Sequence, residues 1–162
     1  MIPKEVEDMF SAIQTPVIFA TAGDKPHATP MNWYYTGDDT FWVSPVGGSR
    51  KIKNMLKNKN VCFATLDHMQ RNERGFIVWG EIAKMETGFL ALLKHFRTMR
   101  KALVEKSEMY FDTKTLKLTK TYYKHPDIYY KFAFPWKRYF VKIKMKKIRY
   151  WLGDGVEREV DL

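Results

Sequence analysis

The chain has 162 residues, of which 45% are hydrophobic and 15% aromatic, and its formal net charge is +10. This length is typical of one domain with a hydrophobic core, and no apolar run is long enough to cross a bilayer. Residues 1–10 are mixed and charged, unlike a secretory signal. Cys62 is the single cysteine, which excludes an internal disulfide and suits a reducing compartment. We therefore expect one cytoplasmic domain over residues 1–162, without a membrane segment.

The positive charge predicts an anionic partner, and nucleic acid, an acidic membrane surface and a phosphorylated small molecule are all compatible with it. Lysines and arginines are dense at residues 50–59, 94–106 and 137–149, but they occur throughout the chain. Such a distribution is more typical of a solvated surface than of a recognition surface. Nucleic acid is therefore the less favoured alternative, with residues 142–149 as its candidate site.

Short apolar runs separated by turn residues predict strands over most of the chain. Helical spacing predicts helices at 4–14 and 51–59, and a third that Thr87 caps, whose apolar stripe over 89–103 we expect to pack on the core. Many short strands with few helices favour a mainly β fold, namely a closed or partly closed antiparallel barrel. The predicted strands are 17–22, 27–35, 40–44, 61–66, 75–84 and 139–145.

Two features predict irregularities within strands. Gly80 lies inside a strand pattern, where glycine is typical of a bulge or of close backbone approach. In the last predicted strand the apolar residues alternate up to Met145 and then resume at Ile148, so the phase slips at Lys146 and Lys147. The slip predicts a bulge or a bend.

A short stretch between a predicted strand and a predicted helix has the composition of a phosphate site. It contains Gly47, Gly48, Ser49, Arg50 and Lys51. Glycines allow a ligand to approach the main chain, a helix N-terminus offers unpaired N–H groups, and lysine adds a point charge. These features predict a phosphate cradle. The alternative is that the glycines only form a turn and the serine only caps the helix.

The sequence offers little support for a metal site or a nucleophile. The histidines His27, His68, His95 and His125 are scattered, and none has ligand spacing to Cys62 or to a carboxylate. No nucleophile elbow is present, and we assign no catalytic residue. Cys62 lies in an apolar run, which predicts a core position for its side chain.

Several motifs, taken in order, resemble a known family. These are residues 26–31, 43–49, 51–56, 60–61, Gly80 and 148–151. They resemble the FMN-binding split barrel of the pyridoxamine 5'-phosphate oxidase-like superfamily. The run Pro45-Val46-Gly47-Gly48, with Lys51 three places on, also resembles the small bacterial FMN-binding proteins of that superfamily. The resemblance covers residues 4–84, and residues 139–153 more loosely, and it favours the cradle over the plain turn.

The resemblance implies a homodimer of six-stranded antiparallel split β-barrels with flanking helices, with one FMN in each of two interface sites. A deazaflavin, F420, is the alternative cofactor, because related barrels use it. Asn54 matches an asparagine common in this family, although capping or backbone hydrogen bonding is its alternative role. The implied flavin contacts are Pro30, Met31, Asn32 and Trp33 at the ring, Pro45, Val46, Gly47 and Gly48 at the ribityl chain, and Ser49, Arg50 and Lys51 at the phosphate.

The first functional hypothesis is an FMN-dependent oxidoreductase or electron carrier, with NAD(P)H or a redox protein as its partner. The arginine-rich signature of authentic pyridoxamine 5'-phosphate oxidases is absent, which argues against pyridoxal phosphate synthesis. The alternatives are a non-enzymatic flavin or small-ligand binding protein and, less favoured, a nucleic-acid-binding module. An aromatic-rich insertion at about 86–138 is expected to cover the flavin or face a partner, with simple packing as the alternative.

Overall fold

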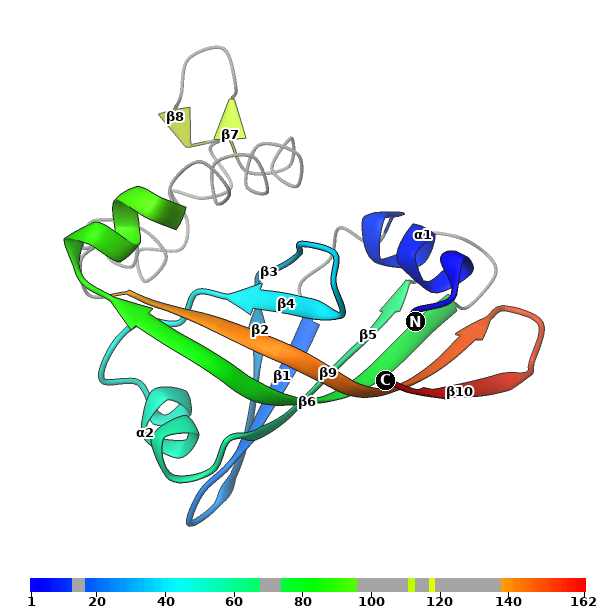
Figure 1. Ribbon diagram of the computed structural model, residues 1–162, viewed down its shortest axis with the longest axis horizontal. Helices are drawn as coiled ribbons and strands as arrows, with labels where there is room; N and C mark the ends of the chain where they lie inside the picture. The colour runs from blue at the N-terminus through cyan, green and yellow to red at the C-terminus, as the bar shows by residue number, and fades with distance from the viewer. Residues whose placement is uncertain (13–16, 68–73, 96–110, 113–116, 119–137) are drawn as a thin grey trace.

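The computed structural model describes residues 1–12, 17–67, 74–95, 111–112, 117–118 and 138–162. An antiparallel eight-stranded sheet has the order β2-β1-β5-β6-β9-β4-β3, with β10 paired to β9 (Figure 1). The helices are α1 (Lys4–Ala12), α2 (Arg50–Lys57) and a short helix at 89–95. The strands are β1 (Val17–Ala22), β2 (Pro26–Met31), β3 (Trp33–Tyr35), β4 (Thr40–Val43), β5 (Asn60–Asp67), β6 (Arg74–Thr87), β9 (Tyr139–Leu152) and β10 (Glu157–Asp161), and a separate pair, β7 (Phe111–Asp112) and β8 (Lys117–Leu118).

The predicted mainly β architecture, a curled antiparallel sheet with flanking helices, is confirmed, but the sheet has eight strands instead of six. Two features account for the difference. The predicted strand at 27–35 is divided at Asn32 into β2 and β3. The charged segment Glu157–Asp161 adds β10 along the outer part of β9.

The division at Asn32 brings the two edges of the sheet together. The strands β2 and β3 lie at opposite ends of the strand order, yet only this one residue separates them in the chain. Consecutive Cα atoms are about 3.8 Å apart, so Met31 on one edge lies within about 8 Å of Trp33 on the other. The sheet is therefore curled, and its seam lies at residues 31–33.

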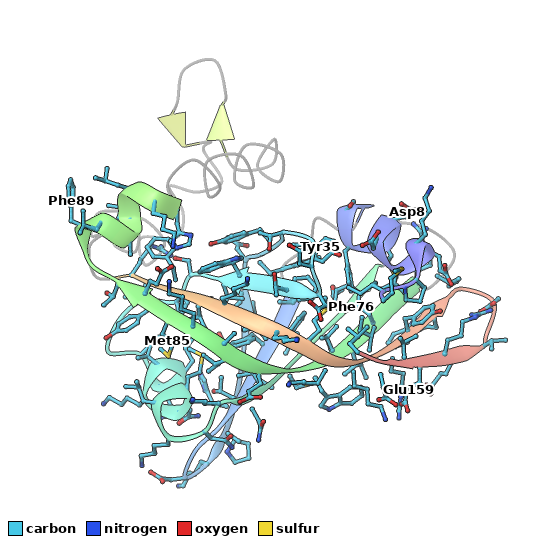
Figure 2. The ribbon with its side chains drawn as sticks, in the orientation of Figure 1. Asp8, Tyr35, Phe76, Met85, Phe89 and Glu159 are labelled. Carbon is cyan, nitrogen blue, oxygen red and sulfur yellow. The ribbon has the colours of Figure 1, made fainter. Side chains whose placement is uncertain are left out.

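Aromatic side chains fill the inside of the curled sheet. Phe10 of α1 packs edge-on against Trp33, Phe41 and Phe76, with ring centroids 4.9–6.0 Å apart. Edge-to-face contacts of this kind stabilise a core beyond the burial of area alone. The hydroxyl of Tyr35 also donates to Glu7 Oε1 of α1 at 2.9 Å (Figure 2). The first helix therefore closes one end of the barrel.

Both predicted strand irregularities are confirmed. Trp79 is opposite Lys147 and Gly80 is opposite Met145, so Lys146 is an extra residue in β9. A Cβ atom at Gly80 would lie 2.7 Å from Ile143 Cγ2 and 2.8 Å from a backbone oxygen, which explains the glycine.

The helix at 89–95 contradicts part of the sequence interpretation. Phe89 and Leu93, predicted to pack on the core, are 66% and 56% exposed, and Figure 2 shows Phe89 directed away from the sheet. Ala91 and His95 are the buried residues of this helix. Thr87 is the last residue of β6 and donates to the carbonyl of Arg138 at 3.1 Å, so it does not cap the helix. Most of the insertion predicted at 86–138 lies outside the described residues, and the single domain therefore stays a prediction.

The outward side of β2, β1, β5 and β6 carries an apolar face. Ile18 is 48% exposed there. Cys62, predicted to be a core residue, is half-buried on this outward side, because the strand alternation places Val61 and Phe63 inside instead. Two cross-strand rows form the face: Pro30, Ile18, Ala64 and Ile77, and Ala28, Ala20, Cys62 and Trp79. No helix within the described ranges has the length and apolar character needed to span a membrane.

Candidate functional site

One contact joins the seam of the sheet to the predicted cradle. Lys51 Nζ, in the first turn of α2, lies 3.3 Å from Met31 Sδ at the end of β2. Ile52 and Met55 on the same helix are buried. The strand residues and the cradle residues that the sequence assigned to one ligand are therefore neighbours in space.

The side chain of Asn54 fixes the position of α2. Asn54 Nδ2 donates to Thr21 Oγ1 of β1 at 3.2 Å and lies 3.5 Å from the Thr21 carbonyl. A Cβ atom at Gly23 would overlap the Asn54 amide, so the glycine leaves room for it. The structure thus gives Asn54 a hydrogen-bonding role within the protein, which was the alternative to ligand contact.

The loop between β4 and α2 is held by the start of β9. Tyr139 N donates to the carbonyl of Pro45 at 3.0 Å, and Arg138 Nη1 donates to the carbonyl of Ser44 at 2.8 Å. Val46 forms an isolated antiparallel bridge with Arg138. These bonds fix the β4 side of the loop, just before its tip at Gly47 and Gly48.

The turn into α2 has one feature typical of any turn and one that a plain turn does not explain. Gly48 has φ +77°, as turn glycines often do, and among the described residues no atom outside Gly48 and its two neighbours lies within 4 Å of a Cβ placed there. Ser49 occupies the N-cap position, but its hydroxyl makes no capping bond. Its Oγ is buried and has no hydrogen-bond partner within the described chain. A buried hydroxyl without a partner costs about 1–3 kcal/mol, so the site is suited to a ligand that accepts a hydrogen bond.

The charges of α2 point to an anion. Arg50 and Lys51 are the first two residues of the helix, and its first turn has no acidic residue. Cations at a helix N-terminus are opposed by the helix dipole, whereas an anion there is stabilised by about 0.3–1 kcal/mol. A phosphate would interact favourably with the dipole, with the free N–H groups and with both cations.

The remaining predicted residues lie around the seam in different ways. Pro30 and Asn32 are exposed, and Met31 is buried beside Lys51. The Trp33 side chain is buried in the core against Phe41, so only its main chain can face a ligand. The structure thus brings the predicted residues into one region while directing the Trp33 ring away from it.

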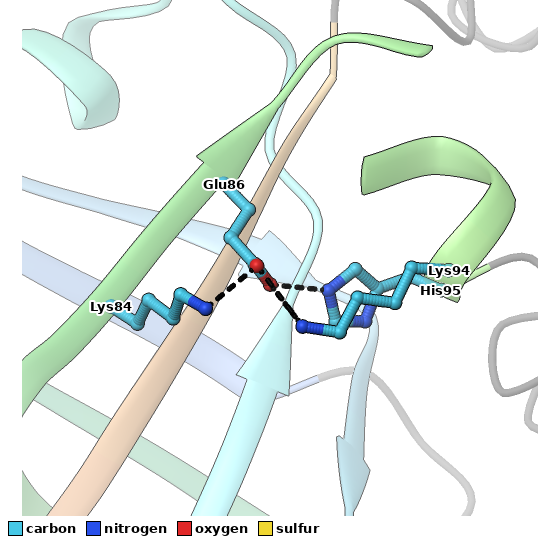
Figure 3. Close-up of polar contacts among 4 residues, drawn as sticks. All are labelled: Lys84, Glu86, Lys94 and His95. Carbon is cyan, nitrogen blue, oxygen red and sulfur yellow. Dashed lines mark hydrogen bonds and ion pairs between the residues drawn. The ribbon is translucent and has the colours of Figure 1, made fainter. Parts of the chain in front are cut away.

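Sequence analysis missed an ionic cluster on the outward side of β6. Glu86 is 2.8 Å from Lys84 Nζ, 3.1 Å from Lys94 Nζ and 2.6 Å from His95 Nε2 (Figure 3). Hydrogen bonds from Lys84, and then from His95, lower the pKa of Glu86 from 4.5 to about 2. Because Glu86 and His95 are nine residues apart on different elements, no spacing rule for a single helix or strand could have paired them.

The imidazole of His95 is held between two aromatic rings. The Trp42 ring centroid is 4.3 Å away and the Phe140 centroid 4.7 Å away, the latter ring nearly parallel. Both rings project from the outward side of the sheet. The short helix at 89–95 is therefore attached to β4 and β9 through one buried histidine.

Residues 2–124 match the family model described as pyridoxamine 5'-phosphate oxidase. The chain belongs to the pyridoxamine 5'-phosphate oxidase family. A search of the curated proteins finds no match. The match to the oxidase family includes the seam, the cradle and the Glu86 cluster, but not β9 or β10.

Solved structures agree with this family at the level of the fold. A conserved hypothetical protein from Mycobacterium tuberculosis is 22% identical with TM-score 0.65, covering 95% of this chain and 86% of its own. A protein named F420 reductase is 15% identical with TM-score 0.64, and the match covers 91% of this chain and 98% of the reductase chain. A FAD-binding protein from Mesorhizobium loti is 18% identical with TM-score 0.58, and the match covers 99% of this chain and 96% of that protein. At these identities the oxidase-family fold is what the comparison shows.

Proposed function

We propose that the protein binds FMN at the seam of the sheet and acts as a flavin-dependent oxidoreductase or electron carrier. The observation that carries the proposal is the buried hydroxyl of Ser49, which has no partner within the described chain although it lies beside two cations. Membership of the pyridoxamine 5'-phosphate oxidase family supports a flavin as the ligand. The similarity to an F420 reductase and a FAD-binding protein is consistent with it.

The residues present fit a flavin mononucleotide. Ser49, Arg50 and Lys51 would bind the terminal phosphate, and the open backbone at Gly48 would let the ribityl chain approach. The main chain at residues 30–33 would meet the polar edge of the ring. A bound flavin supplies hydride or electron transfer, while the chain binds it, orients it and excludes water.

The choice of flavin follows from the phosphate end of the site. One serine and two cations beside one helix N-terminus suit a single dianionic phosphate, which FMN has. F420 is the second candidate cofactor, favoured by the similarity to an F420 reductase. Because the arginine-rich signature is absent, we do not assign pyridoxal phosphate synthesis to this member of the family.

We propose that the protein is a homodimer formed through the apolar outward face. The eight residues of that face are small or apolar, three of them are exposed and five are partly exposed, and a contiguous apolar patch at the surface is typical of an interaction surface. Pro30 of the face directly precedes the seam, so a second copy would lie close to the flavin.

The basic strand offers less support for a nucleic-acid-binding module. Lys147 is paired with Glu159 at 2.5 Å and Arg149 with the same carboxylate at 3.2 Å. A strand partly neutralised by its neighbour β10 is a weaker anion site than α2.

NAD(P)H or a redox protein is the electron source we propose.

An absorption spectrum tests the main proposal. Purified protein would be recorded before and after addition of FMN and desalting, and then mixed with NADH or NADPH under anaerobic conditions. A retained flavin band that bleaches with a nicotinamide supports an oxidoreductase. A retained band that no nicotinamide or redox protein reduces would favour the non-enzymatic binding protein. If the protein stays colourless with FMN but takes up F420, then F420 replaces FMN as the proposed cofactor. If it takes up neither FMN nor F420, the proposal is rejected.

A further inference from the structure

A second region with buried, unpartnered hydroxyls lies on the outward side of the sheet. The hydroxyl of Tyr34 on β3 and that of Ser44, just after β4, are both buried and have no hydrogen-bond partner in the described part of the chain. Tyr34 as a whole is only 7% exposed. Two such groups on neighbouring strands are unusual, because buried polar atoms in proteins nearly always have partners.

The two hydroxyls belong to the same part of the sheet. Tyr34 is directly opposite Trp42 in the β3–β4 pair, and their rings are parallel with centroids 6.4 Å apart. Ser44 lies two residues beyond Trp42, hence on the same side of the extended chain. Trp42 also contacts His95, which connects the Tyr34–Trp42 ring pair to the Glu86 cluster.

The cluster around Glu86, which Trp42 contacts through His95, has more cations than anions. Among the described residues, the carboxylate of Glu86 faces two ammonium groups, those of Lys84 and Lys94. Lys142 is opposite both Trp42 and Lys84 and adds a further cation. Burial, and then the charge of Glu86, raise the pKa of Tyr34, so its phenol is a hydrogen-bond donor at physiological pH.

We propose that Tyr34 and Ser44, beside the Glu86 cluster, form a subsite for the carboxylate of a small organic anion. The two hydroxyls would donate to the carboxylate and the lysines would balance its charge. Ser44 immediately precedes the cradle, and its carbonyl is bound by Arg138. The subsite is therefore adjacent to the flavin site, and its use for the substrate of the flavin rests on the proposed function.

The stability of ligand-free protein gives the first test. Tyr34→Phe removes a hydroxyl without a partner, so we expect the Tm to rise by about 2–4 °C. Tyr35→Phe is the matched control, because its hydroxyl donates to Glu7 at 2.9 Å, and its Tm should fall by a similar amount. A fall in the Tm of Tyr34→Phe would mean that this hydroxyl has a structural partner, and would overturn the proposal.

Binding of benzoate, as a planar carboxylate probe, gives the second test. Calorimetric titration should show benzoate binding to the wild type, binding weakened at least tenfold in Tyr34→Phe and in Ser44→Ala, and unchanged binding in Tyr35→Phe. Benzamide, the neutral analogue, should bind at least tenfold more weakly than benzoate. Absence of benzoate binding to the wild type, equal binding to Tyr34→Phe, or equal binding of benzamide would each overturn the proposal.

The same samples separate this inference from the proposed function. Each variant would be loaded with FMN and desalted as above. If Tyr34→Phe loses FMN together with benzoate, Tyr34 belongs to the flavin site and a separate subsite is rejected. If no form of the protein takes up a flavin while benzoate binding still depends on Tyr34, the subsite stands and the proposed function fails.

Discussion

Lys51 Nζ lies 3.3 Å from the sulfur of Met31, so the first turn of α2 touches the residue at which one edge of the sheet ends. Lys51 thus lies both at the seam and at the N-terminus of α2, where a phosphate oxygen would be a strong partner for its ammonium group. This position makes Lys51 the side chain whose removal should most directly weaken cofactor binding.

We expect Lys51→Ala to weaken FMN binding by about 10–100-fold, the loss typical of one charge-assisted hydrogen bond. Lys53→Ala is the matched control, because Lys53 is exposed on the same helix and should leave the affinity unchanged. Fluorescence titration of apoprotein with FMN measures both. Equal affinities in the two variants would remove Lys51 from the phosphate site.

Replacement of Gly48 tests the shape of the cradle. Gly48→Val places a branched side chain at φ +77°, which we expect to reduce the free energy of unfolding by about 1–2 kcal/mol and to abolish FMN loading. Gly37→Val is the control, because Gly37 has φ +80° and similarly open space, but lies in the turn before β4. It should destabilise comparably and load normally. Normal loading of Gly48→Val would contradict the cradle.

Asn54→Ala tests whether α2 depends on its bond to β1. The change leaves the buried Thr21 hydroxyl without this donor, and we expect a loss of about 1–3 kcal/mol in the free energy of unfolding. Urea denaturation of Asn54→Ala, Thr21→Val and the double variant measures the coupling. Additive losses would show that the two side chains are energetically independent.

The Glu86 cluster predicts a dependence of stability on pH. The pKa of Glu86 is 4.5 in the unfolded chain and about 2 in the folded protein, chiefly because Lys84 and His95 hydrogen-bond to the carboxylate. Its stabilising contribution is therefore complete above pH 4.5 and is lost as the pH falls through 2. We expect Glu86→Gln to be less stable near neutrality and to lose less stability between pH 4.5 and 2.

Urea midpoints measured across this pH range provide the comparison. Glu81→Gln is a suitable control, because the contact of Glu81 with Lys146 is longer, at 3.6 Å, and exposed. If Glu86→Gln and the wild type lose stability in parallel over this interval, the cluster does not govern the acid sensitivity.

A charged residue on the apolar outward face should prevent dimer formation. Ile18→Glu introduces a carboxylate at the centre of the face, and we expect a monomer by light scattering after gel filtration. Val156→Glu is the matched control, because Val156 is 50% exposed and Ile18 is 48% exposed, but Val156 lies in the turn before β10. That variant should keep the oligomeric state of the wild type. A dimeric Ile18→Glu protein would place the interface elsewhere.

Local patterns predicted much of this structure. The turn residues, the alternation of apolar positions and the phase slip at Lys146 depend on neighbouring residues, and sequence displays them directly. The composition of residues 47–51 likewise indicated a helix N-terminus with cationic side chains, where α2 begins at Arg50.

Relationships between distant residues were not predictable in the same way. The sequence predicted a single strand at 27–35, and nothing in this run shows that its two halves, β2 and β3, form opposite edges of one sheet. Periodicity indicates which residues share a helix face, but not which way that face points, so Phe89 was assigned to the core and is exposed. The pairing of Glu86 with His95 depends on how a helix docks on a strand.

The extra residue in β9 joins two stretches of opposite phase into one strand. Because side chains alternate with a period of two, Met145 and Ile148, three positions apart, share the inner face only with an additional residue between them. Deleting Lys146 would give one continuous alternation, in which Ile148 and Tyr150 stay inward and Lys147 and Arg149 stay outward. Lys146 is therefore a position in β9 where the loss of a single residue is compatible with the burial pattern of the whole strand.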